Sequence, residues 1–278
     1  MKVIPWDSLQ TEAGLDDIAE ICRGKAGLAL TIGGFDGPHI GHSVLFDAVL
    51  TAARAGNLAS GVVTFTRSPS LRKRGHLYPG DVSTLKLRLD AFRSRGFDCA
   101  VLIDFSTDFG KMSGGVFFEI LVKTARMKYL AVGPDFRCGH RLDTGTPEIS
   151  EISRREAFRF DSIRQVELDG ERVSSSAVRN AVQTADFALA ERLLGHPFLL
   201  DFNAPVWTDV DGSYEASAGS FTQILPPVGR YRVVASTANG SGDKAVFEVA
   251  DSVVRLTAAG NGPLPDMRGI ATIDFRLS

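Results

Sequence analysis

Residues 28–42 decide the fold and read Leu-Ala-Leu-Thr-Ile-Gly-Gly-Phe-Asp-Gly-Pro-His-Ile-Gly-His. The first five residues form an apolar run, which is typical of a buried parallel strand. The glycines that follow have no side chain, so the backbone can turn tightly and come close to a ligand. Apolar residues at helical spacing over Ser43–Ala55 then predict a helix. Strand, glycine turn and helix in this order predict a phosphate site, because the N–H groups at the start of a helix attract anions.

Two histidines, His39 and His42, stand three positions apart where this helix is expected to begin. That spacing predicts both imidazoles on one face of the first turn, where they can donate hydrogen bonds to a triphosphate. A histidine in the core or at a helix end is the alternative for either residue alone, but the surrounding strand, turn and helix favour a nucleotide site. We therefore predict a transferase that moves AMP from ATP to a phosphate acceptor, a reaction that depends on positioning and charge stabilisation.

The alternation of strand and helix continues to about residue 198. Further strands are predicted at Gly61–Phe65, Cys99–Ile103, Tyr129–Val132 and Asp161–Val166. Helices are predicted at Leu85–Arg95, Val116–Ala125, Ile149–Phe158, Ser174–Ala181 and Asp186–Leu194, the last with Asp186 as its N-cap. The pattern predicts an α/β, Rossmann-like domain with a parallel sheet over residues 1–198.

From residue 199 the sequence changes character. Strand-like segments alternate with Gly, Pro, Asn and Asp turns, and no helical stretch is evident. The clearest of these segments are Tyr231–Ala235, Ala245–Val249, Val253–Thr257 and Ile270–Phe275. Residues 199–278 are therefore predicted to form a small antiparallel, barrel-like β domain.

The composition narrows the class of protein. The formal net charge of the 278 residues is −2, which gives no sign of DNA or RNA as the main partner. Cys22, Cys99 and Cys138 are odd in number and widely spaced, so we expect neither a disulfide framework nor a structural zinc site. No apolar run is long enough to span a membrane, and the N-terminus lacks the pattern of a signal peptide. We therefore expect a cytoplasmic protein.

Four segments together resemble a known family. Thr31–His42 is similar to the first signature of the adenylyltransferase module of bacterial bifunctional riboflavin kinase/FAD synthetases, in the H-x-G-H nucleotidyltransferase superfamily. Val62–Phe65, Val132–Gly139 and Val173–Arg179 resemble further segments of that module in the same order. The resemblance covers about residues 28–198 and implies that ATP and FMN are the substrates, with Mg²⁺ accompanying ATP.

The resemblance also implies roles for individual residues. The catalytic residues would be His39, His42 and Arg179. The flavin of FMN would contact Phe65 and Phe136. ATP would contact Gly33, Gly34, Phe35, Asp36, Gly41, Asp135, Arg137, Ser175 and Ser176. No residue is assigned as a ligand of the Mg²⁺ ion.

Taken without the resemblance, several of these segments have structural alternatives. Ser174–Ser176 suits a plain helix cap, residues 133–137 suit a turn with a capping aspartate, and Phe65 suits the core. Two positions depart from the family pattern: Cys138 stands where phenylalanine is usual, and Thr66–Pro69 lacks the usual acidic residue and histidine. Further along, Arg72-Lys73-Arg74 suits either an acceptor phosphate or a solvated basic loop, and we favour the loop.

The C-terminal segment resembles a riboflavin kinase barrel only in part. Residues 226–234 are similar to the P-x-G-x-Y stretch of that barrel, but the G-x-P-T-A-N signature is missing, since Thr237-Ala238-Asn239 lacks the preceding proline. We therefore predict FMN adenylyltransferase activity without riboflavin kinase activity. A related transferase with another phosphate acceptor and a catalytically silent flavin- or nucleotide-binding protein are the alternatives. The sequence does not indicate an oligomeric state.

Overall fold

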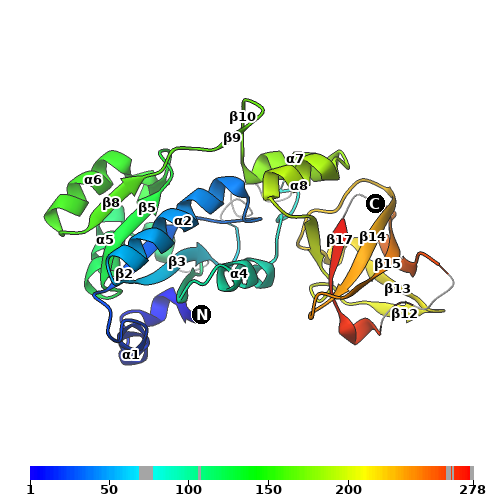
Figure 1. Cartoon of the computed structure of the whole chain (residues 1–278), viewed down its shortest axis with the longest axis horizontal. Coiled ribbons are helices and arrows are strands. Elements are labelled where there is room, and N and C mark those ends of the chain that lie inside the picture. The colour runs from blue at the N-terminus through cyan, green and yellow to red at the C-terminus, as the bar shows by residue number, and fades with distance from the viewer. Residues whose placement is uncertain (69–77, 106–107, 261–263, 265, 276–278) are drawn as a thin grey trace. The chain divides into compact units, whose positions relative to one another are not determined.

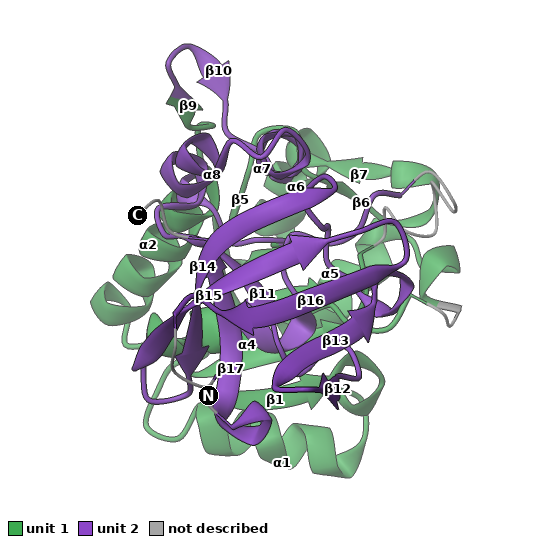
Figure 2. Ribbon diagram, turned by 90° about the vertical axis from the view of Figure 1, so that its right-hand side faces the viewer, with its two compact units in different colours: residues 1–35, 41–73, 89–167 green, residues 36–40, 74–88, 168–278 purple. Residues whose placement is uncertain are grey.

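The computed structural model describes residues 1–68, 78–105, 108–260, 264 and 266–275. The chain forms two compact units (Figure 2). Unit 1 consists of residues 1–35, 41–73 and 89–167, and unit 2 of residues 36–40, 74–88 and 168–278. Unit 2 therefore includes the central residues of the glycine turn. The predicted division of the chain at residue 198 stays a prediction.

Unit 1 is built on a six-stranded parallel sheet with the order β1-β4-β3-β2-β5-β8. Figure 1 labels β2, β3, β5 and β8 of this sheet. The bounds are β1 (Lys2–Pro5), β2 (Leu28–Ile32), β3 (Ala59–Phe65), β4 (Cys99–Ile103), β5 (Met127–Val132) and β8 (Arg159–Ser162). Chain order runs outward from β2 through β3 to β4 on one side, and through β5 to β8 on the other. The order thus reverses between β2 and β5, and the carboxyl ends of these strands form the crevice in which such sheets bind ligands.

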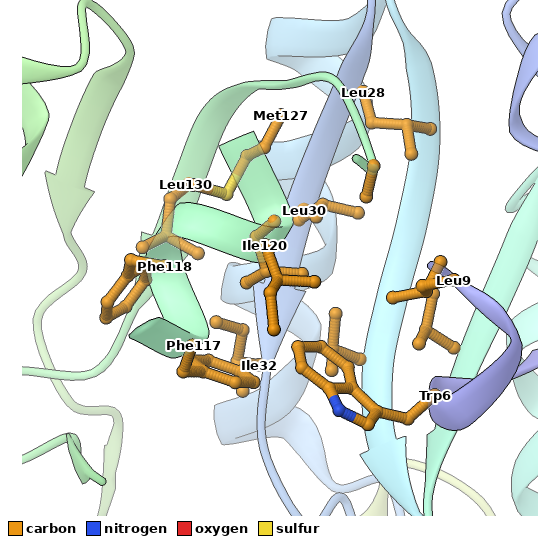
Figure 3. Packing of buried hydrophobic residues seen from close by; sticks show 14 of the residues in the cluster. Trp6, Leu9, Leu28, Leu30, Ile32, Phe117, Phe118, Ile120, Met127 and Leu130 are labelled. Carbon is orange, nitrogen blue, oxygen red and sulfur yellow. The ribbon is translucent and has the colours of Figure 1, made fainter. Parts of the chain in front are cut away.

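Helices cover both faces of this sheet. They are α1 (Glu12–Ile21), α2 (Ile40–Ala55), α4 (Leu85–Ser94), α5 (Gly114–Lys123) and α6 (Thr146–Arg155). Side chains of β2 alternate between the two faces, with Leu28, Leu30 and Ile32 in one buried cluster and Ala29 in the other. The first cluster is shown in Figure 3, where the rings of Trp6 and Phe117 lie close together; they stack with centroids 4.9 Å apart.

Three details of unit 1 differ from the predictions. The strand predicted at Asp161–Val166 was placed too late, because β8 spans Arg159–Ser162. This edge strand pairs only with β5 and has no apolar run of its own to mark it. Helix α2 begins at Ile40, so His39 precedes the helix and only His42 lies in its first turn. The elements β1 and α1 were not predicted; β1 has four residues, of which one is buried.

Unit 2 contains two helices followed by an antiparallel sheet. Helix α7 (Ser175–Gln183) is capped by Ser174, whose hydroxyl accepts a hydrogen bond from Ala177 N at 3.1 Å. Helix α8 (Phe187–Leu194) begins at the predicted cap Asp186, which accepts a hydrogen bond from Leu189 N at 2.9 Å. The sheet has seven strands in the order β11-β17-β14-β15-β16-β13-β12.

The strands of unit 2 are β11 (Phe198–Asp201), β12 (Thr208–Val210), β13 (Ser213–Ser217), β14 (Gly229–Thr237), β15 (Gly242–Val249), β16 (Val253–Ala258) and β17 (Ile270–Phe275). Phe187 of α8 stacks on Phe275 with centroids 4.6 Å apart, so α8 shares a core with the sheet. A Rossmann-like parallel sheet followed by a barrel-like antiparallel sheet confirms the predicted fold class. Within the described residues, no helix combines the length and the apolar character needed to cross a membrane.

Candidate active site

The turn after β2 is fixed to the sheet of unit 1 by its backbone. Gly33 N donates a hydrogen bond to Val63 O at 3.1 Å, and the Thr64 hydroxyl donates one to Gly34 O at 3.1 Å. Phe35 has a left-handed backbone (φ 46°), and its ring is buried against Phe46 with centroids 5.1 Å apart. A Cβ at Gly33 would lie 2.8 Å from that ring, so packing requires glycine there. The side chain of Phe35, a predicted ATP contact, belongs to the core.

A cavity of about 440 Å³ lies in unit 1 at the carboxyl ends of the strands. Both predicted flavin contacts, Phe65 and Phe136, line it, and so do the predicted ATP contacts Gly33, Gly34 and Arg137. The remaining lining residues are Ile103, Phe105, Phe109, Gly110, Met112, Phe117, Cys138, Gly139, Arg141 and Leu142. The wall is thus largely apolar and includes five phenylalanines, and the glycine turn forms another part of the same cavity.

Residues 137–145 form one wall of this cavity as a short hairpin of β6 (Arg137–Cys138) and β7 (Thr144–Gly145). Arg137 Nε and Nη2 both donate hydrogen bonds to Leu142 O, at 3.1 and 2.9 Å, so the guanidinium holds the hairpin together. Burial raises the pKa of the Cys138 thiol to about 12, which keeps it protonated at neutral pH. Asp135, another predicted ATP contact, is exposed and is not among the residues that line the cavity.

Asp36, from the glycine turn, lies in a buried polar network of unit 2. One carboxylate oxygen accepts hydrogen bonds from Val82 N at 2.8 Å and Ser83 N at 3.0 Å, and the other pairs with Arg179. Burial raises the pKa of the Asp36 carboxyl, and the Arg179 guanidinium and the two amides offset part of that rise. The adjacent Gly37 (φ 60°) donates to the Ser83 hydroxyl at 2.8 Å.

Arg179 of α7 is held from several sides in the same network. Its Nε donates to Gly80 O at 2.9 Å, its Nη2 donates to the Tyr78 hydroxyl at 3.0 Å, and its guanidinium carbon lies 5.2 Å from the centroid of the Tyr78 ring. The exposed fraction of its side chain is 12%, against 9% for Asp36. The structure thus brings the predicted catalytic Arg179 and the predicted ATP contact Asp36 together as a buried ion pair.

The β sheet of unit 2 supports this network through Gln223. The side-chain amide of Gln223 donates to Val82 O and to Leu199 O, each at 2.9 Å, and its oxygen accepts from Asp201 N at 2.8 Å. The Thr84 hydroxyl donates to the Asp201 carboxylate at 2.7 Å. The segment that supplies both amides to Asp36 is therefore fastened to β11.

The two predicted catalytic histidines have different surroundings. His39, in unit 2, is 5% exposed, and burial together with the Arg172 charge lowers its pKa to about 4. His42, in unit 1, is half-buried in α2 with its ring edge-on to Phe35 at 5.1 Å between centroids. Gly41 lies between them in sequence, in the first turn of α2. His39 is accordingly a neutral imidazole at pH 7.

The serines at the start of α7 also differ from one another. The Ser175 hydroxyl donates a hydrogen bond to Asp36 O at 2.7 Å and so ties α7 to the glycine turn. Ser176 is exposed in the first turn of the helix. Across the described residues, no group of three or more His, Cys, Asp or Glu side chains could hold a metal ion. The basic stretch Arg72-Lys73-Arg74 lies outside the described residues.

Several residues of these regions were not predicted from the sequence. Phe105 and Phe109 follow β4 at the ligand-binding edge of the sheet, so the same strand-end rule that selected Phe65 could have found them. Tyr78 and Gln223 meet Arg179 and Val82 across 101 and 141 positions of sequence, and no local pattern marks them.

Comparisons with known proteins agree with the geometry. A family model described as FAD synthetase matches residues 23–177. The bifunctional riboflavin kinase/FMN adenylyltransferase of Escherichia coli is 32% identical over 240 residues, which are 85% of this chain and 76% of that protein. The protein of the same name from Haemophilus influenzae is 32% identical over 173 residues, covering 62% of this chain and 56% of that protein. A crystal structure of a macrolide-efflux protein from Streptococcus pneumoniae has the same fold, with a TM-score of 0.79 over 99% of this chain and 90% of that one at 19% identity. The family model and the Escherichia coli relative show that the chain belongs to the FAD synthetase family.

Proposed function

We propose that the protein transfers the adenylyl group of ATP to FMN, giving FAD and pyrophosphate. The observation that carries this proposal is the cavity of unit 1, in which Phe65 and Phe136 share one space with the backbone of Gly33 and Gly34. Aromatic side chains suit the flat, largely apolar ring system of a flavin. Glycine backbone suits the close approach of a phosphate.

The reaction is an in-line displacement. A phosphate oxygen of FMN attacks the α-phosphorus of ATP, the bond from that phosphorus to the bridging oxygen breaks, and pyrophosphate leaves with the electron pair. His42 lies in the first turn of α2, where helix N–H groups favour phosphate. His39, neutral because its pKa is about 4, acts as a hydrogen-bond donor to the triphosphate and carries no charge. Mg²⁺ enters with ATP, held by phosphate oxygens and water.

In this proposal Arg179 both supports the glycine turn and contacts the triphosphate. A guanidinium has five N–H donors, and the hydrogen bonds to Gly80, Asp36 and Tyr78 use three of them. Among the described residues, none accepts from the two donors on Nη1, which are left for phosphate oxygens. The exposed Ser176, at the start of the same helix, supplies a further hydroxyl.

The proposal does not include riboflavin kinase activity. Thr237-Ala238-Asn239 is the part of the chain most similar to the kinase signature, and its polar side chains close the hairpin between β14 and β15. The Thr237 hydroxyl donates to Ser241 O at 2.9 Å, and the Asn239 side chain accepts from Ser241 N at 3.1 Å. Side chains used in this way support a turn and not a nucleotide site.

Purified protein with Mg·ATP and either FMN or riboflavin tests both parts. We expect FAD and pyrophosphate from FMN, and no FMN from riboflavin, when the products are separated by chromatography. No FAD from FMN would remove the adenylyltransferase proposal. FMN formed from riboflavin would remove the proposal that the kinase is absent. Product from a different phosphate acceptor, with none from FMN, would favour another transferase of the superfamily.

A further inference from the structure

Two arginines line the cavity of unit 1, and they differ in what their side chains contact. Arg137 donates from Nε and Nη2 to Leu142 O, so its guanidinium is part of the hairpin. Arg141 is exposed, and within the residues that the structure describes its side chain makes no hydrogen bond or ion pair. The remaining lining residues are apolar side chains, a thiol and glycines. Among the described residues of the cavity wall, Arg141 is therefore the cation whose whole guanidinium is available to a ligand.

The backbone that presents Arg141 is strained. Arg141 and Leu142 both have left-handed conformations, with φ of 56° and 60°, which residues other than glycine seldom adopt. Neighbouring contacts impose this shape: His140 N donates to Met112 O at 2.7 Å, and the Asp143 carboxylate accepts from Gly114 N at 3.0 Å. Strain of this kind, maintained by the surrounding fold, is characteristic of binding sites.

We propose that Arg141 binds the phosphate of the flavin substrate and so makes the cavity select FMN over riboflavin. This rests on the proposed function, because it assigns the cavity to the flavin. An aromatic wall binds the ring of both flavins equally, since the two differ only in the phosphate group. Selection therefore needs a group that contacts the phosphate, and a guanidinium forms paired, charge-assisted hydrogen bonds with a phosphate. Arg137 uses Nε and Nη2 to hold the hairpin and keeps only Nη1 for a ligand, whereas the whole guanidinium of Arg141 can pair with a phosphate.

The test compares Arg141→Gln with a matched control, Arg126→Gln. Arg126 is also exposed and left-handed (φ 54°), but it precedes β5, at the end of the sheet away from the cavity. Binding of FMN and of riboflavin is measured without ATP, by quenching of flavin fluorescence. We expect Arg141→Gln to weaken FMN binding about tenfold or more and to leave riboflavin binding within about twofold, as for loss of a charged hydrogen bond. Arg126→Gln should match the wild type, and Arg141→Lys should restore part of the preference.

Other outcomes would overturn the assignment. If Arg141→Gln weakens the binding of FMN and of riboflavin equally, Arg141 shapes the cavity and does not bind the phosphate. If neither changes, another group binds the phosphate. Steady-state kinetics give a second readout, a higher KM for FMN with an unchanged KM for ATP. Because binding is measured without turnover, a wild-type protein that forms no FAD but prefers FMN, with that preference lost in Arg141→Gln, would contradict the proposed reaction and still support the role of Arg141.

Discussion

The cavity wall at residues 137–145 and the polar network around Asp36 show two opposite uses of arginine. In the network, Arg179 is buried and its hydrogen bonds go to a carboxylate, a carbonyl and a hydroxyl of the protein. In the wall, Arg141 is exposed on a strained backbone. A buried and satisfied polar group fixes geometry, whereas an exposed cation beside an apolar cavity is available for a ligand. We infer that the network mainly holds the turn in place, with Nη1 of Arg179 left for the triphosphate, and we propose that the wall binds the flavin.

The largest expected effect comes from removing the guanidinium of the network. Arg179→Met leaves the Asp36 carboxylate buried without its partner, and we expect a loss of about 3–5 kcal/mol in the free energy of unfolding. Urea unfolding monitored by circular dichroism measures it.

The matched control is Arg192→Met. Arg192 pairs with Asp169 on the surface, with exposed side-chain fractions of 52% and 68%, so the change should be under about 1 kcal/mol. If both variants lost the same free energy of unfolding, the buried pair of Arg179 and Asp36 would stabilise the fold no more than a surface pair does.

The two histidines allow a sharper comparison of activity with stability. His42→Ala removes a proposed contact to the triphosphate, and we expect kcat for FAD formation to fall by about 10²–10³-fold, as for loss of one transition-state donor. Its half-buried ring touches Phe35, so the free energy of unfolding should fall by only about 1 kcal/mol. The exposed His196, changed to alanine, is the control and should leave kcat unchanged. Loss of stability as large as the loss of activity would mark His42 as a structural residue.

Because the pKa of His39 is lowered, we expect the free energy of unfolding to depend on pH. Its pKa is lowered to about 4 in the fold from an ordinary value of 6.5, so between these values the unfolded chain binds the extra proton. The stability that His39 contributes is therefore complete above pH 6.5 and is lost as the pH falls to about 4. The full difference is on the order of 3 kcal/mol.

The measurement is urea unfolding of wild type and His39→Gln at several pH values from 7 to 4. We expect the wild type to lose more stability than the variant over this range. Asp36 contributes in the opposite direction because its pKa is raised, but it is present in both proteins and cancels in the difference. Parallel pH profiles would show that His39 is not buried as a neutral ring.

Local sequence predicted much of the fold and only part of the site. The run Leu28–Ile32 and the glycines after it determine a strand and a turn through nearest-neighbour physics, so both were predictable. That Phe65 and Phe136 lie at one edge of the sheet was also predictable, because the carboxyl ends of parallel strands lie at the same edge. The proposed role of Arg141 could not be predicted from the sequence, since its backbone conformation depends on contacts of its neighbours with Met112 and Gly114. The same holds for the network, which joins residues more than a hundred positions apart.

The hydrogen bonds of Gln223 lead us to expect that the β sheet of unit 2 supports the network around Asp36. Gln223→Leu removes three buried hydrogen bonds and leaves Val82 O, Leu199 O and Asp201 N without that partner. We expect a loss of about 1–3 kcal/mol in the free energy of unfolding, because unsatisfied buried groups lose their hydration without compensation. The segment that donates two amides to Asp36 should loosen, and kcat for FAD formation should fall with it.

Flavin binding separates this effect from general damage. The cavity lies wholly in unit 1, so Gln223→Leu should leave the Kd for riboflavin within about twofold of wild type while stability and kcat fall. Gln183→Leu, an exposed position at the end of α7, is the matched control and should change none of the three. If riboflavin binding weakened in step with kcat, the cavity and the network would be one cooperative structure. The wall would then no longer be separable from the network, as a part that binds substrate beside a part that holds the turn in place.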